Sequence, residues 1–337
     1  MICTLTSNSG SRTPTPNSGT SAVVFAYHNV GVRCLSVLLA HGVDVALVVT
    51  HRDSPNETIW FDSVATLAEL HSIPVITPDD PNEPEIVARI AALHPDFLFS
   101  FYYRLMLKAP LLATAQRGAY NMHGSLLPKY RGRVPVNWAI IHGERETGAT
   151  LHRMLEKPDA GEIIAQQAVP ILPDDTAFVV FNKVTVAAEM AFDRVLPQLI
   201  DGSAPHLPQD LSKGGYFGGR KAEDGRIDWR QPARSIHNLV RAVAPPYPGA
   251  FCKVKPGSVY DKIASCATLR VLKTLPTDRS PRSPQPGLYA ADGQIFADCG
   301  PDGDTQVLRL LALELDGVAL DVKEFLKRFG PEKILLS

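Results

Sequence analysis

Short apolar runs alternate with helix-like stretches over residues 21–201, and this alternation constrains the fold more than any other feature of the chain. Runs rich in Val, Ile, Leu and Phe predict buried strands, and the stretches between them have helical spacing. The predicted strands cover residues 22–27, 43–50, 96–101, 119–122, 149–154 and 162–169, and the predicted helices cover residues 33–41, 62–70, 84–93 and 177–199. This pattern favours an α/β domain with a mostly parallel sheet, whose ligands bind beyond the carboxyl ends of the strands.

The remainder of the chain predicts a second, smaller domain at residues 220–337. Residues 202–219 are dense in Pro and Gly and are interpreted as a linker. Several short strand candidates separated by turn sequences lie between residues 251 and 313, which is typical of a small β-barrel of the OB-like kind. Two helices are predicted, at residues 232–243 and 322–329. Residues 1–20 are rich in Ser, Thr, Asn, Pro and Gly, so we expect a disordered N-terminal extension there, native or not.

Charge and cysteine content exclude several classes of protein. The formal net charge is −1, which points neither to nucleic acid nor to an anionic membrane. The five cysteines are widely spaced and form no C-x-x-C pair, which favours free thiols in a reducing cytosol over a disulfide framework or a zinc site. No apolar stretch is long enough to span a bilayer, and no signal peptide is recognisable. We therefore expect a cytoplasmic protein without membrane insertion.

The sequence NMHGSLLPKYRGR at residues 121–133 is the most informative stretch, because it leaves a predicted strand and enters a loop. Asn121 and His123 stand two residues apart, so an extended backbone turns both side chains to the same side. An Asn amide can donate to a developing oxyanion, and a His can move a proton near neutral pH. The alternative is an ordinary strand end with a buried core His, and spacing alone favours that alternative.

The sequence KPDAG at residues 157–161 offers a carboxylate, Asp159, in what is first an ordinary turn. A carboxylate beside His123 would hold the imidazole in one tautomer and raise its pKa. We expect the Asp159 carboxylate within hydrogen-bond reach of the His123 ring, or one water away.

Other motifs carry less weight. The sequence HNVG at residues 28–31 follows the first predicted strand but lacks the three-glycine dinucleotide fingerprint, which argues against a nicotinamide cofactor. No P-loop, H-E-x-x-H or G-x-S-x-G motif occurs. The aromatic pair before Arg104 could line a pocket, although such residues are more often packed in a core.

The combination of NMHGSLLP at residues 121–128 with DAG at residues 159–161 resembles the folate-dependent formyltransferases. That family includes glycinamide ribonucleotide, methionyl-tRNA and sugar-nucleotide enzymes. The resemblance implies a Rossmann-like catalytic domain, 10-formyltetrahydrofolate as co-substrate, transfer of a formyl group to a primary amine, and no metal. It implies catalytic roles for Asn121 as oxyanion donor, His123 as a charged imidazolium and proton shuttle, and Asp159 as the group that orients His123.

The likeness is greatest to one branch, the formyltransferase domains of bifunctional enzymes that make UDP-4-amino-4-deoxy-L-arabinose for lipid A modification. It rests on VFAYH at 24–28, FSFYYR at 99–104, VNW at 136–138, TLHRM at 150–154 and HNLVRAV at 237–243. It implies a nucleotide-linked amino sugar as the acceptor. The decarboxylase domain of those enzymes has a dinucleotide fingerprint that does not occur here, so we expect either a stand-alone enzyme or an excised domain. The protein partners left open are a second copy of the chain, as a homo-oligomer, and a separate decarboxylase.

The same resemblance implies contact residues. For the folate donor they are Leu105, Met106, Leu107, Arg133, Leu155, Glu156, Lys157, Pro158 and Asp159. For the acceptor they are Tyr27, Arg104, Ser125, Lys129 and Arg131. The branch has a His at the position of Leu105, so only backbone contacts with folate would survive at that position.

Three other functions remain as alternatives. A methionyl-tRNA formyltransferase would share the trio, but tRNA binding requires clustered Lys and Arg, and the basic residues after residue 200 are scattered. We therefore expect no nucleic-acid partner. A non-catalytic or hydrolytic folate-binding relative is opposed by the intact trio, and an oxidoreductase is opposed by the missing glycine fingerprint.

Overall fold

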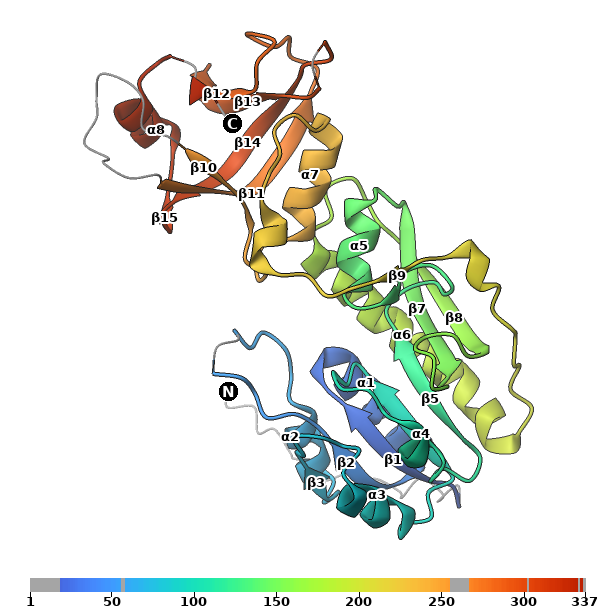
Figure 1. Ribbon diagram of the computed structural model, residues 1–337. Helices are drawn as coiled ribbons and strands as arrows, with labels where there is room; N and C mark the ends of the chain where they lie inside the picture. The colour runs from blue at the N-terminus through green and yellow to red at the C-terminus, as the bar shows by residue number, and fades with distance from the viewer. Residues whose placement is uncertain (1–18, 56–57, 255–266, 302, 333, 336–337) are drawn as a thin grey trace, which may run out of the picture. The chain divides into compact units, whose positions relative to one another are not determined.

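The computed structural model describes residues 19–55, 58–254, 267–301, 303–332 and 334–335. The chain divides into two compact units (Figure 1). The first unit comprises Met1–Arg52, Phe61–Asn121 and Phe192–Pro205, and the second comprises Asp53–Trp60, Met122–Ala191 and His206–Ser337. Most of the predicted N-terminal extension, together with Cys3 and Cys266, lies outside the described residues.

The first unit is a parallel sheet with helices between its strands. Its strands are β1 (Ser21–Ala26), β2 (Asp44–Val49), β3 (Val75–Ile76), β4 (Phe97–Phe101) and the beginning of β5 (Gly118–His123), in the order β3-β2-β1-β4-β5. Strand β1 runs parallel to both β2 and β4, and β2 runs parallel to β3. The helices are α1 (His28–Ala40), α2 (Val64–Leu70), α3 (Pro84–Ala91) and α4 (Ala109–Leu112). The predicted parallel α/β architecture is confirmed, although α1 begins earlier than the predicted start at residue 33.

Strand β4 shows why these strands appear as unbroken apolar runs in the sequence. Phe99 and Phe101 project to one face and meet Phe192, with ring centroids 5.2 and 5.1 Å apart. Leu98 on the opposite face is also fully buried. A strand covered on both faces has no polar side to alternate with, as expected in a parallel sheet.

The second unit contains two further layers. Its first part holds β6 (Arg131–Gly132), β7 (Glu146–Arg153), β8 (Ile163–Pro170) and β9 (Tyr216–Phe217), together with α5 (Pro135–Ile141) and the start of α6 (Ala177–Asp201). Strand β7 pairs antiparallel with β8, and β6 pairs parallel with β9. Strand β9 lies inside the stretch 202–219, whose role as a linker stays a prediction.

The chain after residue 219 forms an antiparallel β domain. Its strands are β10 (Ala250–Val254), β11 (Ala267–Thr277), β12 (Gly287–Ala291), β13 (Gln294–Cys299), β14 (Gln306–Leu315), β15 (Val318–Ala319) and β16 (Ile334–Leu335). Six of them follow the order β10-β11-β14-β13-β12-β16, and β15 pairs with β14. Helix α7 (Ala233–Ala242) packs on β11 and β14, and α8 (Val322–Phe329) packs on β12 (Figure 1). The predicted fold class, a mostly parallel sheet followed by a smaller β domain, is confirmed.

A buried guanidinium fastens α7 to the preceding part of the second unit. Arg241 is 7% exposed and donates to the carbonyl oxygens of Asp175 at 3.0 Å and Leu172 at 3.3 Å. Its Nε donates to Asn238 Oδ1 at 3.0 Å. These bonds matter because a buried charge without acceptors costs far more than it contributes. The β domain therefore docks through the loop before α6.

The described residues provide two further facts about the chain. No helix among them is both long and apolar enough to cross a membrane. The thiols of Cys34, Cys252 and Cys299 are buried and form no disulfide among the described residues.

We expect Arg241→Ala to lower the free energy of unfolding by about 2–4 kcal/mol. The change leaves the buried carbonyl oxygens of Asp175 and Leu172 without their hydrogen-bond donor. Urea unfolding followed by tryptophan fluorescence measures the change. Arg230→Ala is the matched control, since the Arg230 side chain is 78% exposed, and its effect should stay within about 0.5 kcal/mol. Equal midpoints for the two variants would contradict this docking role.

Candidate active site

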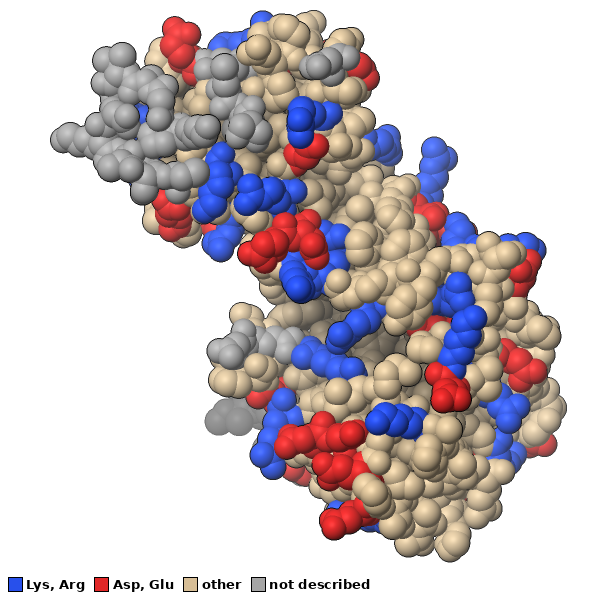
Figure 2. Space-filling view, viewed as in Figure 1, with Lys and Arg blue, Asp and Glu red and all other residues tan. Residues whose placement is uncertain are grey.

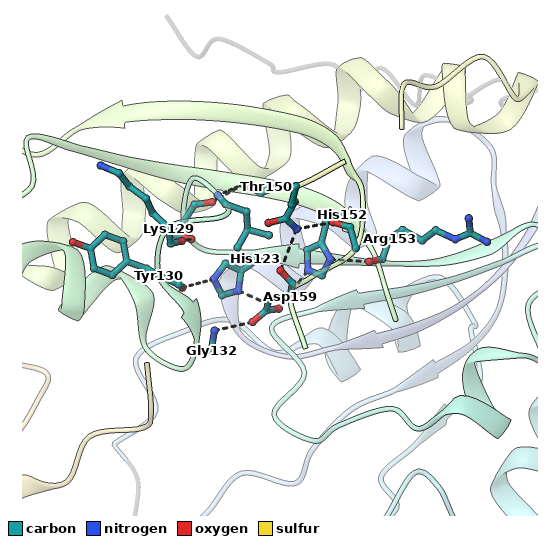
Figure 3. Close-up of polar contacts among 12 residues, drawn as sticks. His123, Lys129, Tyr130, Gly132, Thr150, His152, Arg153 and Asp159 are labelled. Carbon is teal, nitrogen blue, oxygen red and sulfur yellow. Dashed lines mark hydrogen bonds and ion pairs between the residues drawn. The ribbon is translucent and has the colours of Figure 1, made fainter. Parts of the chain in front are cut away.

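Asp159 lies in the turn after β7, and a backbone N–H holds its carboxylate. The nitrogen of Gly132 donates to Asp159 Oδ2 at 2.8 Å, and the side chain is only 13% exposed (Figure 3). Gln209 Nε2 donates to the carbonyl oxygens of Asp159 at 3.1 Å and Gly161 at 2.6 Å, which fastens the turn. The carboxylate is thus fixed in position from both ends of its turn.

Two glycines make this arrangement sterically possible. Gly132 has a φ of +100°, and a Cβ there would lie 2.2 Å from the carbonyl oxygen of Phe217 on the paired strand β9. A Cβ at Gly161 would lie 2.0 Å from the carbonyl oxygen of Arg153. Both positions need a residue without a side chain, which explains the glycine in each of the two motifs found in the sequence.

His123 ends β5 and is 6% exposed. Its Nε2 donates to the carbonyl oxygen of Tyr130 at 2.8 Å, and its Nδ1 lies 3.6 Å from Asp159 Oδ1 (Figure 3). The second distance suits an ion pair but is too long for a direct hydrogen bond. The structure therefore brings together His123 and Asp159, which the sequence separates by more than thirty residues.

His152 is the residue that sequence reasoning missed. It lies on β7, is 2% exposed, and places Nε2 at 3.4 Å from the same Asp159 Oδ1. Its Nδ1 donates to the carbonyl oxygen of Arg153 at 2.9 Å. A signal existed in the sequence, since Thr150 and His152 are polar residues two apart in the interior of β7, and both are buried.

The two imidazoles are arranged alike around the carboxylate. A backbone carbonyl accepts a hydrogen bond from one nitrogen of each ring, so the second nitrogen of both His123 and His152 faces Asp159 Oδ1.

Burial and charge act in opposite directions on this set. Burial raises the pKa of Asp159, but the two imidazoles and the Gly132 N–H lower it further, so it lies below its usual range. Burial lowers the pKa of His123, and Asp159 and the Tyr130 carbonyl offset that effect only in part. The carboxylate is therefore ionised, whereas the protonation of His123 depends on the balance between burial and the charge of Asp159.

The loop between His123 and Gly132 is cross-linked by its own polar groups. Ser125 Oγ donates to the carbonyl oxygen of Lys129 at 2.6 Å, and Thr150 Oγ1 donates to that of Ser125 at 2.6 Å (Figure 3). Arg131 donates to the carbonyl oxygens of Leu211 and Gly214.

Two predicted acceptor contacts take part in these bonds. Ser125 is fully buried and Arg131 is 9% exposed, so both side chains hold the loop, and their contact with the acceptor stays a prediction. The Lys129 side chain, by contrast, is 55% exposed and pairs with Glu144 at 3.3 Å.

Tyr27 and Arg104 lie together in the first unit, at the carboxyl ends of β1 and β4. The Arg104 guanidinium lies 4.6 Å above the Tyr27 ring, and the Arg104 N–H donates to His51 Nε2 at 3.0 Å. His51 stacks on Tyr103 with centroids 4.1 Å apart. Burial and the nearby Arg104 lower the pKa of His51 to about 4, so it accepts this bond as a neutral ring. Strand order reverses between β1 and β4, where α/β sheets bind ligands.

The predicted folate contacts divide between the two units. In the first, Leu105 and Met106 are 39% and 54% exposed, whereas Leu107 is buried. In the second, Leu155 is 49% exposed on the turn that carries Asp159. Arg133, Glu156 and Lys157 are exposed as well, and Pro158 is half-buried.

Asn121 belongs to the first unit and precedes His123 by two positions on β5. No group of three or more His, Cys, Asp or Glu side chains able to hold a metal occurs in the part of the chain that the structure describes.

Solved structures with the same fold include two sugar formyltransferases. WlaRD, a sugar 3N-formyl transferase determined in the presence of dTDP and 5-N-formyl-THF, has a TM-score of 0.63 at 20% identity, covering 86% of this chain and 97% of that one. The N-formyltransferase from Helicobacter canadensis, in complex with folinic acid and dTDP-3-aminofucose, has a TM-score of 0.62 at 20% identity, covering 86% and 98%. HypX from Aquifex aeolicus has a TM-score of 0.58 at 18% identity, covering 92% of this chain and 47% of that one.

Sequence profiles are more specific than these structural likenesses, which at such identities show a shared fold. The formyl transferase profile matches residues 33–196, and the profile of the formyl transferase C-terminal domain matches residues 220–330. The two matches together span most of the chain, and each coincides with one of the two kinds of sheet described above. The protein is an enzyme of the formyl transferase family.

Proposed function

We propose that this enzyme transfers the formyl group of 10-formyltetrahydrofolate to the 4-amino group of a nucleotide-linked amino sugar, with UDP-4-amino-4-deoxy-L-arabinose as the preferred acceptor. The observation that carries the proposal is the Asp159 carboxylate, which the Gly132 N–H holds between two buried imidazoles. One of them, His123, lies on the strand that also bears Asn121. Such a set can accept and release one proton near neutral pH without a metal.

The chemistry requires one proton to move from the attacking amine to the folate nitrogen. The amine nitrogen forms a bond to the formyl carbon, and the carbonyl oxygen becomes an oxyanion to which the Asn121 amide donates. His123 takes the amine proton at Nδ1, because its Nε2 proton is engaged by Tyr130. The ionised Asp159 stabilises the imidazolium, which returns the proton to N10 as the carbon–N10 bond breaks. A donor to the oxyanion is worth about 2–4 kcal/mol of transition-state stabilisation.

Exposed apolar side chains support a folate donor. Leu105, Met106 and Leu155 each leave well over a third of their surface uncovered, and ligand sites are lined mainly by such groups. The two sugar formyltransferases of similar fold were determined with 5-N-formyl-THF and with folinic acid.

Charge supports a nucleotide sugar over tRNA as the acceptor. The exposed cations Lys129 and Arg133 on the loop 128–138 suit a small anionic ligand. On the face shown in Figure 2, basic and acidic side chains are interspersed and make no continuous basic stripe, whereas tRNA binding needs many phosphate contacts. The two similar sugar enzymes carry dTDP and dTDP-3-aminofucose. Our preference for the UDP sugar, the precursor of lipid A modification, rests on the loop residues 128–138.

We expect Asn121→Ala and His123→Gln each to reduce kcat by at least about a hundredfold, because each removes a group acting on the transition state. Turnover is measured by mass spectrometry as gain of one formyl group. Lys213→Gln is the control, since the Lys213 side chain is 75% exposed. Near-normal turnover in either active-site variant, with unfolding midpoints unchanged, would refute the roles assigned here.

Asp159→Asn should lower the pKa of His123, since the carboxylate raises it in the wild type. The same change should slow transfer while folinic acid still binds, because the imidazolium loses its counter-charge. An NMR titration of the His123 ring in the wild type and in the variant measures the pKa. A pKa that rises or stays constant would count against the pairing.

The acceptor is tested with a panel of UDP-4-amino-4-deoxy-L-arabinose, dTDP-3-aminofucose and initiator methionyl-tRNA, each with 10-formyltetrahydrofolate. We expect the UDP sugar to be formylated with the highest kcat/KM and the tRNA to be left unchanged at low and moderate salt. Formylation of the tRNA with both sugars untouched would overturn the proposal. Release of formate without any acceptor would identify a hydrolase instead.

A further inference from the structure

A second concave site lies in the second unit, between α5, the short 3-10 helix Ala222–Gly225 and the segment that joins α7 to β10. Its volume is about 120 Å³, and its lining includes Asn137, Arg220, Lys221 and Tyr247. Pockets that hold a whole ligand have volumes of about 300–1,000 Å³, so this pocket is sized for one part of a ligand. None of these four residues belongs to the Asp159 set.

The two cations of this pocket differ in how they are held. The Arg220 guanidinium lies 4.7 Å above the Trp138 ring and donates through Nη2 to the carbonyl oxygen of Asp224 at 2.7 Å. Its Nε is buried and has no hydrogen-bond partner among the described residues. The Lys221 side chain is exposed, and only its backbone nitrogen is engaged, by Asp224 Oδ2 at 2.6 Å.

One donor of Arg220, its Nε, stays unused by the described residues in this arrangement. The charge of Asp224 acts on Arg220, and Asp224 Oδ2 accepts from the Lys221 backbone N–H. Burial lowers the pKa of Arg220, which shows that the guanidinium has lost part of its hydration. A desolvated cation with an unpaired N–H gains from an anion that supplies the missing acceptor.

A short, rigid path joins the pocket to the Asp159 carboxylate. Val134 lines the pocket and follows Gly132, the residue that holds Asp159, by two positions. Two residues of chain span at most about 7 Å. Trp138 Nε1 also donates to the carbonyl oxygen of Gly218 at 3.0 Å, which ties the chain leading to Arg220 to α5.

We propose that this pocket binds the diphosphate of the acceptor, with Arg220 and Lys221 on its oxygens. The identity of the acceptor rests on the proposed function, whereas the anionic character of the ligand rests on the pocket itself. Adjacent cations on consecutive residues match two linked phosphates, and Arg in particular can bind two oxygens at once. The glutamate carboxylates of folate are the other anionic source, and the experiment separates the two.

The experiment is calorimetric titration of the full chain with UDP, with uridine and with folinic acid, without turnover. Arg220→Gln and Lys221→Gln are the test variants, and Arg230→Gln is the charge-matched control outside the pocket. We expect each test variant to bind UDP at least about tenfold more weakly, the loss typical of one charge-assisted hydrogen bond. Binding of folinic acid should stay unchanged, as should UDP binding by the control.

Several outcomes would overturn the inference: UDP that does not bind the wild type, UDP affinity equal in wild type and both variants, or a loss confined to folinic acid. Lys221 is exposed, so its variant tests the proposal even where Arg220→Gln unfolds. Failure of the proposed function is distinguishable, because a chain that binds UDP through Arg220 but formylates no amino sugar supports the pocket alone. If Arg220→Gln and Lys221→Gln both formylate the acceptor with an unaltered KM, the role of the pocket is contradicted, whereas the proposed function stands.

Discussion

The buried negative charge of Asp159 is the constraint on which the site depends. The Asp159 carboxylate is 13% exposed, and among the described residues one backbone N–H, that of Gly132, donates to it. Moving such a group out of water costs several kcal/mol unless nearby groups compensate it. The compensation comes from His123 and His152 together, which explains why a single carboxylate oxygen faces a nitrogen of both rings.

Much of the second unit serves to keep this group in place. Strand β6 brings Gly132 under the carboxylate only because β9, some eighty residues later, pairs with it. Gln209 in the same later stretch holds the turn from its other side. The Pro- and Gly-rich segment 202–219 thus helps to hold the Asp159 turn, through Gln209 and strand β9.

Elements whose residues are close together in the sequence could be predicted from it. Elements that form through contacts between distant residues could not. Unbroken apolar runs predicted β1 and β4 because residues buried on both faces leave a local pattern. The trio of Asn121, His123 and Asp159 was found through motif resemblance, and the structure brings the latter two within 3.6 Å. The two-residue strand β9 left no pattern of its own, since it forms only by pairing with β6. Nor did any pattern show that Ser125 is fully buried, which depends on Thr150 from a distant strand.

The bond between His123 Nε2 and the carbonyl oxygen of Tyr130 has a further consequence. Every residue type has a main-chain carbonyl, so the tautomer of the imidazole is independent of which side chain occupies position 130. Evolution can therefore exchange residues along this loop to reshape recognition without altering how the ring handles protons. The loop's length, by contrast, is not free to drift. Inserting or deleting one residue between His123 and Tyr130 would move the Tyr130 carbonyl away from Nε2. The imidazole ring could then rotate or change tautomer.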